Sequence, residues 1–209
     1  MDYLLICMIA LTEMTAGHDQ TYVDRLAQTF PERLDVCLDV AMTASDHDVS
    51  IEMAVAVAYE ESRFLPDVES SAGAVGPMQV IPRYHCPNRT IENCDVVDAG
   101  VNALARYKHR YQTWPEALCH YNAGNTCNDG SRRYARRVQS RAERLHNRFI
   151  ETAAVAGRRL VLPVPLENLG ALRSLKSSPT TNRGQQIDSM LLYPSGLGGS
   201  IGVRADVRK

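Results

Sequence analysis

The stretch that decides the fold is "IEMAVAVAYEESRFLPDVESSAGAVGPMQVIP", residues 51–82. Residues 51–62 are apolar nearly all round, which predicts a buried central helix. A strand over "MAVAVAY" is the alternative, but the alanines and the flanking glutamates favour a helix. Pro66 ends this element, and residues 67–77 form a loop rich in Ser and Gly. The following "MQVIP" is expected to return to the core as a helical turn.

Apolar residues recur at helical spacing on both sides of this stretch. Asp48, Thr113 and Ser131 are expected to cap helices, and Thr113 with Glu116 has the spacing of a capping box. The predicted fold class is therefore mainly α. The predicted helices lie before and after Pro31, and over residues 51–62, 98–111, 113–123 and 131–149.

Charge is unevenly distributed, although the net charge of the 209 residues is only −1. Residues 1–70 carry 14 Asp and Glu against 3 Arg, a balance of −11, and the remaining residues carry 20 bases against 10 acids, a balance of +10. Such asymmetry can mark a nucleic-acid partner. The simpler interpretation is two complementary faces of one fold, and no nucleic-acid partner is expected.

The six cysteines form an even set without the CxxC spacing of a zinc or redox motif. Two pairs, Cys86 with Cys94 and Cys119 with Cys127, would each close a short loop, which suits disulfides in an oxidising compartment. Six cysteines allow 15 pairings, so the sequence leaves the connectivity open. The disulfide candidates are Cys86, Cys94, Cys119, Cys127, Cys7 and Cys37.

A zinc site built from His85, Cys86, Cys119 and His120 is an alternative use of these residues. It is disfavoured because side chains of adjacent residues rarely bind one ion together. No metal and no cofactor is expected.

The N-terminal run "MDYLLICMIAL" holds nine consecutive apolar residues, too few to span a bilayer. Asp2 stands where a secretory signal carries positive charge. We expect a buried helix or strand of the fold, and no transmembrane span.

Glu61 is the better catalytic candidate of the adjacent pair Glu60 and Glu61. An apolar wall, the negative end of the helix and the charge of Glu60 would each raise the pKa of Glu61, as a general acid requires. Neighbouring helical residues point about 100° apart, so only one of them faces a cleft. The line through Met53 and Val57 favours Glu61, and Glu60 is expected to be a solvated neighbour.

Two segments, "ESRFLPDVESSAGAVGPMQVIP" at residues 61–82 and "ALCHYNAG" at 117–124, resemble the soluble lytic transglycosylase (SLT) family. That family shows Glu-Ser, an aromatic and a Pro, then Ser, then Gly-Ala-x-Gly-Leu-Met-Gln and Pro, and Tyr-Asn-Ala-Gly farther on. Order and spacing are kept over roughly residues 32–148. The resemblance implies a lysozyme-like helical domain.

The resemblance also implies roles for single residues. Glu61 would be the sole catalytic acid and base, and Ser70 the serine that hydrogen-bonds it. Core packing is the alternative role for Met78, and a half-buried core position the alternative for Tyr121. The cleft floor and its opposite wall would be formed by Gly73, Gly76, Met78, Gln79, Tyr121 and Asn122.

The implied reaction uses one carboxyl group where hydrolytic glycosidases typically use two. Glu61 would protonate the oxygen between N-acetylmuramic acid and N-acetylglucosamine in peptidoglycan. It would then accept the proton of the sugar's own 6-hydroxyl, giving a 1,6-anhydromuramic end. A goose-type-like muramidase that uses water, and a structural component with a vestigial fold, are the alternatives.

Two features depart from the family pattern. Pro77 stands where the family has Leu or Tyr, which predicts a stiffer loop. The cysteine pairs are additions, and a bond at Cys119 could fix the nearby "YNAG" turn. The helix expected at residues 131–149 is rich in arginine and would close the domain. Its arginines could bind peptide-stem carboxylates or an acidic partner, and a solvated surface is the simplest expectation.

The expected organisation is an N-terminal apolar helical segment at 1–30, a catalytic domain at 31–149 and an extended C-terminal arm at 150–209. The arm is expected to dock onto other subunits of a larger apparatus, first a phage tail or virion, second a secretion system. Peptidoglycan as substrate predicts action outside the cytoplasm, in the periplasm or cell wall.

Overall fold

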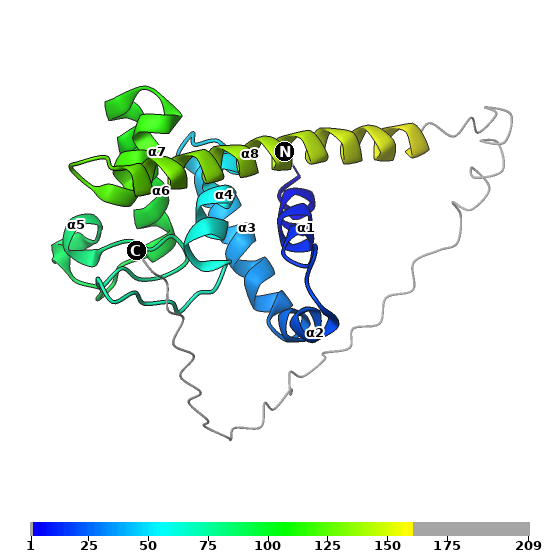
Figure 1. The fold of residues 1–209 in the computed structure, drawn as a ribbon, viewed down its shortest axis with the longest axis horizontal. Coiled ribbons are helices and arrows are strands. Elements are labelled where there is room, and N and C mark those ends of the chain that lie inside the picture. The colour runs from blue at the N-terminus through cyan, green and yellow to red at the C-terminus, as the bar shows by residue number, and fades with distance from the viewer. Residues whose placement is uncertain (1, 161–209) are drawn as a thin grey trace, which may run out of the picture. The chain divides into compact units, whose positions relative to one another are not determined.

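The computed structural model describes residues 2–160, with side chains to residue 156, and these residues are mainly helical (Figure 1). The mainly α fold class is confirmed. Residues 1–157 form one compact unit. The elements are α1 (Tyr3–Glu13), α2 (Gln20–Gln28), α3 (Phe30–Asp46), α4 (Ile51–Ser62), α5 (Pro82–His85), the short 3-10 helix η1 (Pro87–Arg89), α6 (Val96–Tyr111), α7 (Trp114–Ala123) and α8 (Asp129–Leu160).

The central helix α4 is buried along nearly its whole length, as its composition predicts. Its cap is Ser50, whose hydroxyl accepts a hydrogen bond from the Met53 N–H, so the prediction of Asp48 as cap is wrong. Asp48 has a left-handed φ of 54° and lies in the turn before the helix. Arg63, also left-handed at φ 57°, is the C-cap of α4 and directly follows Ser62, the last residue of the helix.

Helix α1 belongs to the core, which confirms that the N-terminal apolar run is an element of the fold. Ile6, Cys7 and Leu11 are at most 1% exposed, and Cys7 is bonded to Cys37 of α3. No helix of the described residues combines the length and the apolarity that crossing a membrane needs.

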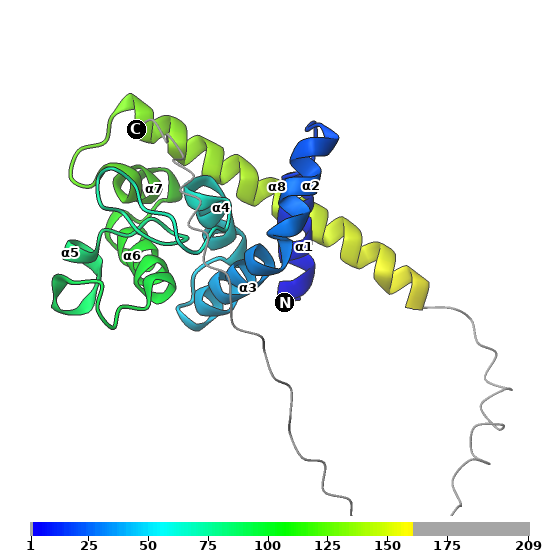
Figure 2. The same ribbon diagram turned by 90° about the horizontal axis from the view of Figure 1, so that it is seen from below.

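Helix α8 lies across α4 and α1 in both views (Figures 1 and 2). Arg141 forms ion pairs with Glu13 of α1 at 3.1 Å and with Glu60 of α4 at 3.1 Å. Acidic residues of the first part of the chain thus meet basic residues of the second. These ion pairs agree with the interpretation of the charge asymmetry as complementary faces of one fold.

The N-terminal caps of α7 and α8 differ from the predicted ones. Thr113 precedes α7 without a side-chain cap bond, and Glu116 instead pairs with Arg132 at 3.0 Å. At the start of α8, the Asn128 Oδ1 accepts from the Ser131 N–H and the Ser131 hydroxyl accepts from the Asn128 N–H. Ser131 is therefore the inner partner of a reciprocal cap, not the cap itself.

Helix α8 also continues to Leu160, through the beginning of the segment expected to be an extended arm. Residues 161–209, the rest of that arm, lie outside the described residues.

Candidate active site

Glu61 is the penultimate residue of α4 and is half-buried. Two consecutive left-handed residues, Arg63 and Phe64, turn the chain sharply after it. Phe64 is fully buried and its ring packs edge-on against Tyr59, 6.0 Å between centroids. The packing of Phe64 against Tyr59 thus fixes the end of the helix that carries Glu61.

Two tyrosine hydroxyl groups, from α7 and α8, lie within electrostatic reach of Glu61. Burial raises the pKa of Tyr121 well above its ordinary value of 10.0, and the negative charge of Glu61 is the next cause. Burial and then the charge of Glu61 raise the pKa of Tyr134 in the same way. Both phenols therefore stay protonated at neutral pH, as hydroxyl groups beside a carboxyl group.

Tyr121 also joins α7 to the loop beside the site. Its hydroxyl donates a hydrogen bond to the Met78 carbonyl at 2.8 Å. Its ring packs edge-on against Tyr107 of α6, 6.1 Å between centroids. Tyr121 is half-buried, as the packing alternative expects, and it lies beside Glu61, as the resemblance implies.

The prediction that Glu60 is a solvated neighbour is wrong. Its side chain is 7% exposed and forms ion pairs with Arg137 at 3.2 Å and with Arg141 at 3.1 Å. The Arg141 guanidinium lies over the Tyr59 ring, 3.3 Å from its centroid. The two glutamates thus point to different surroundings, Glu60 to arginines and Glu61 to tyrosines.

The loop after α4 closes in a tight turn, and the prediction of a helical turn at "MQVIP" is wrong. Val75 and Val80 exchange two backbone hydrogen bonds of 2.8 and 3.0 Å around residues 76–79. Within that turn the Gln79 N–H bonds to the Gly76 carbonyl at 3.1 Å, so Pro77 occupies the second position of a β-turn. Proline suits this position, because its fixed φ matches the turn and no N–H is required there.

Gly76 meets two separate requirements. Its φ is +73°, and a Cβ there would lie 2.7 Å from the Val96 side chain. Gly73 has a φ of +75° with open space around it. Both glycines shape the loop, and only Gly76 is also required by close packing.

The other predicted loop residues hold the loop together. Met78 is fully buried against Gly100, as the core-packing alternative expects. The Gln79 side-chain amide donates to the carbonyls of Val68 and Gly76, at 3.0 and 3.1 Å, which leaves its oxygen for other partners. The Ser70 hydroxyl accepts from the Ala74 N–H at 3.1 Å, so its implied bond to Glu61 stays a prediction.

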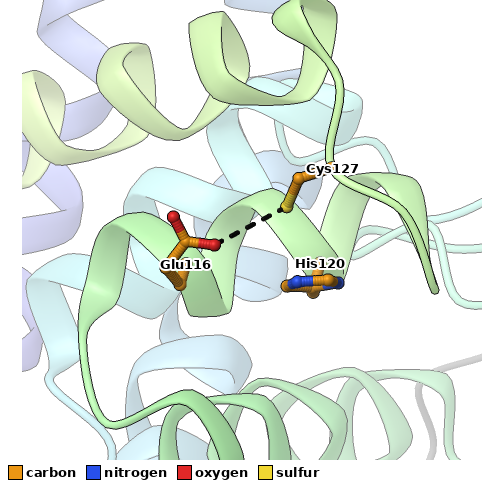
Figure 3. A group of neighbouring side chains, drawn as sticks. All are labelled: Glu116, His120 and Cys127. Carbon is orange, nitrogen blue, oxygen red and sulfur yellow. Dashed lines mark hydrogen bonds between the residues drawn. The ribbon is translucent and has the colours of Figure 1, made fainter.

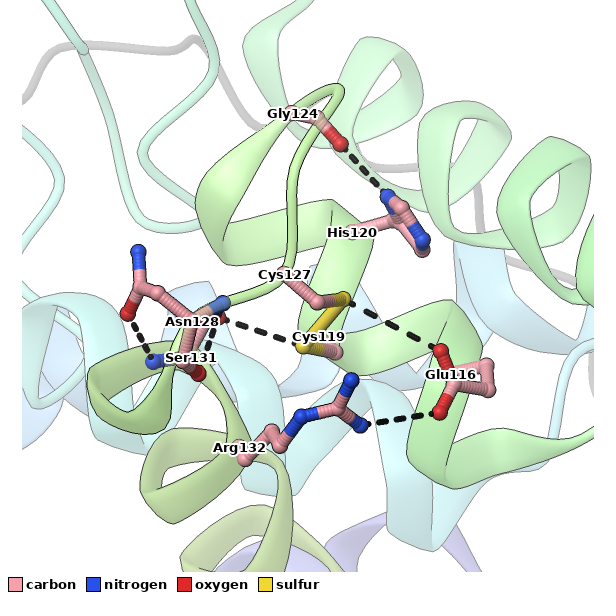
Figure 4. The surroundings of a disulfide bond; sticks show 8 residues. All are labelled: Glu116, Cys119, His120, Gly124, Cys127, Asn128, Ser131 and Arg132. Atoms are coloured by element: carbon pink, nitrogen blue, oxygen red, sulfur yellow. Dashed lines mark hydrogen bonds and ion pairs between the residues drawn. A yellow bond between two sulfur atoms is a disulfide. The ribbon is translucent and has the colours of Figure 1, made fainter.

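The described cysteines form three disulfides and none is free. Cys86 is bonded to Cys94, and Cys119 to Cys127, as the short spacings indicate. The Cys119–Cys127 bond ties α7 to the loop before α8 (Figure 4). Tyr121 follows Cys119 by two residues in α7, and Asn122, the next residue, is exposed. This bond restrains the segment that carries Tyr121.

The proposed zinc set is not assembled, because Cys86 and Cys119 belong to different disulfides. Possible ligand atoms of Glu116, His120 and Cys127 do lie within 4.8 Å of one another (Figure 3). While Cys127 is bonded to Cys119, it offers no thiolate, and a metal would find only Glu116 and His120. The His120 Nδ1 is already bonded to the Gly124 carbonyl at 2.7 Å.

Sequence reasoning missed Tyr134 as a member of the site. It lies on the apolar stripe of α8 and is 4% exposed, so its pattern indicated a core residue. Its hydroxyl is the feature of the sequence that could have indicated the site, because a buried phenol normally has a polar neighbour.

Comparison with models of protein families matches residues 39–144 to the transglycosylase SLT domain. The match covers 106 of the 209 residues, just over half of the chain. Searches of curated proteins and of solved structures gave no match.

Proposed function

Because the chain belongs to the transglycosylase SLT domain family, with its lysozyme-like helical fold, we propose that it cleaves peptidoglycan with Glu61 as its single acid and base. The observation that carries this proposal is the placement of Glu61 at a fixed helix end, with the phenols of Tyr121 and Tyr134 in its field. Glu60, the other candidate carboxylate, forms ion pairs with Arg137 and Arg141.

In the first step Glu61 donates its proton to the oxygen between N-acetylmuramic acid and N-acetylglucosamine, and the bond to the anomeric carbon breaks. The substrate's N-acetyl group supports the oxocarbenium ion that develops. The Glu61 carboxylate then takes the proton of the 6-hydroxyl, whose oxygen bonds to the anomeric carbon. The 1,6-anhydro end forms without water, and Glu61 returns to its protonated state.

The two phenols stabilise the anionic form of Glu61 between these steps. Their raised pKa values keep them as neutral donors throughout the cycle. The Tyr121 hydroxyl already donates to the Met78 carbonyl, whereas a hydrogen bond with the Glu61 side chain is one of the causes that raise the pKa of Tyr134. Tyr134 is therefore the better placed donor toward a charged Glu61.

The test is digestion of purified sacculi by wild type, Glu61→Gln and the control Glu151→Gln, an exposed residue at the far end of α8. Mass spectrometry should find anhydromuramic ends with wild type and with the control, and none with Glu61→Gln. Hydrated reducing ends would instead show a muramidase. Undiminished cleavage by Glu61→Gln would refute its role, and no cleavage by wild type would favour a structural component.

We further propose that the enzyme acts outside the cytoplasm and opens the wall locally for a larger apparatus, a phage tail or virion first, a secretion system second. The three disulfides support an oxidising location. The docking segment would lie in residues 161–209. A chain ending after Leu160 should retain activity on sacculi but fail to enter the assembled apparatus, and normal incorporation would contradict the proposal.

A further inference from the structure

The strongest charged feature beyond Glu61 is a groove of about 540 Å³ along the first half of α8. Five arginines and a single carboxylate line it, so its side chains sum to a charge of +4. The lining residues are Glu60, Arg133, Arg136, Arg137, Ser140, Arg141 and Arg144.

Two of the five arginines are already neutralised inside the protein. Arg137 and Arg141 bind Glu60, and Arg141 also binds Glu13 at 3.1 Å. Arg141 is largely buried, its side chain 14% exposed. Arg141 fastens α8 to α4 and α1, and Arg137 fastens it to α4.

The other three, Arg133, Arg136 and Arg144, are exposed and form no ion pair or hydrogen bond within the part of the chain that the structure describes. With Ser140 they recur at steps of three and four residues, which places them along one stripe of the helix. From Arg133 to Arg144 this stripe is about 16 Å long. Unpaired guanidinium groups in a row suit an elongated ligand with several carboxylates or phosphates.

The groove lies beside the end of α4 that carries Glu61, and its own carboxylate is Glu60. Glu60, in its wall, directly precedes Glu61. Tyr134, whose hydroxyl is in the field of Glu61, has the Arg137 guanidinium over its ring, 5.9 Å from the centroid. Tyr134 thus lies between Glu61 and Arg137, so the groove is close to the catalytic carboxyl.

We propose that the groove binds the peptide stem of peptidoglycan through its carboxylates, an inference that rests on the function proposed above. The glycan strand is uncharged at its N-acetylglucosamine units and gives arginines little to bind. The stem hangs from the muramic acid residue whose bond is broken, and it carries free carboxylates. An extended stem of three to five residues spans roughly 10–17 Å, which matches the stripe.

The experiment compares wild type with the triple variant Arg133→Gln, Arg136→Gln, Arg144→Gln on two substrates. One is intact sacculi, and the other is glycan from which an amidase has removed the stems. A control with the same charge change is Arg25→Gln, Arg89→Gln, Arg110→Gln, at exposed positions of α2, η1 and α6. Circular dichroism checks that all three proteins are folded.

We expect the groove variant to lose at least tenfold in kcat/KM on stem-bearing sacculi and less than twofold on stripped glycan, with the control close to wild type on both. Calorimetry with a free tetrapeptide stem, using the Glu61→Gln protein, should show at least tenfold weaker binding when the three arginines are replaced. This measurement needs no catalysis, so it decides the inference even if no anhydro product forms.

Equal losses on both substrates, or unchanged tetrapeptide binding, would overturn the proposal. Binding of poly(glycerol phosphate) without binding of the tetrapeptide would also overturn it, and would assign the groove to a phosphate polymer. An acidic protein that binds wild type but not the groove variant, with the tetrapeptide inactive, would overturn it in favour of a partner surface.

Discussion

The hydroxyl of Tyr121 donates a hydrogen bond to the main-chain carbonyl of Met78, 2.8 Å away across 43 residues of sequence. This bond connects α7 with the turn at residues 76–79. Because Met78 is fully buried, its carbonyl has no access to bulk water as a substitute partner.

Tyr121→Phe should therefore lower the free energy of unfolding by about 1–2 kcal/mol, since a buried carbonyl loses its donor. Turnover on sacculi should fall roughly tenfold, because the turn is no longer fixed against α7. Urea unfolding and muropeptide release measure the two effects. Tyr84→Phe, at a 63% exposed residue, is the control and should change neither.

The two loop glycines should respond differently to alanine. Gly73→Ala has open space and should cost about 1–2 kcal/mol for its positive φ alone. Gly76→Ala should cost roughly 1–3 kcal/mol more, because its Cβ would overlap Val96. Thermal unfolding of both variants measures this difference, and equal costs would show that Val96 moves aside freely.

The disulfides Cys119–Cys127 and Cys86–Cys94 form a matched pair, since both span eight residues. Replacing either by two serines should cost about 2–3 kcal/mol by loop-closure entropy. Only loss of Cys119–Cys127 should also lower turnover by several fold, because that bond restrains the segment of Tyr121. If both double variants lose turnover alike, the effect reflects stability alone.

Glu52 should make stability depend on acidic pH. Burial raises the pKa of Glu52, but hydrogen bonds, the strongest from His146 at 3.0 Å, outweigh burial and set it below its ordinary value of 4.5. Because the pKa of Glu52 is lower in the folded protein than in the unfolded chain, ionised Glu52 stabilises the fold at pH values above 4.5. This stabilisation is lost as the pH falls through the pKa of Glu52 in the folded protein. The stability gap between wild type and Glu52→Gln should thus narrow below pH 4.5.

Urea unfolding between pH 7 and pH 3 measures this gap. Glu143→Gln, an exposed neighbour on α8, should follow wild type at every pH. A gap of constant size would mean that Glu52 does not contribute through its ionisation.

How far the sequence predicts the molecule depends on where the partners of each residue lie along the chain. The burial of α4 and the two short-range disulfides follow from local pattern. The surroundings of Glu60 do not, because its arginines come 77 and 81 residues later. The place of Pro77 in a β-turn follows only from the backbone hydrogen bonds between Val75 and Val80. The Cys7–Cys37 disulfide joins residues 30 positions apart and was one of many possible pairings.

The ion pairs of Arg141 can form only late in the synthesis of the chain. Its ion pair with Glu13 joins residues 128 positions apart, and its pair with Glu60 joins residues 81 apart. Contacts of such sequence separation form late, because the entropy lost on closing the long intervening chain must be overcome. On the ribosome, α1 and α4 emerge long before α8, the helix that covers them. Their apolar faces therefore stay uncovered until α8 has been synthesised. A nascent chain stalled before residue 141 should therefore be a client for chaperones and should lack activity on sacculi.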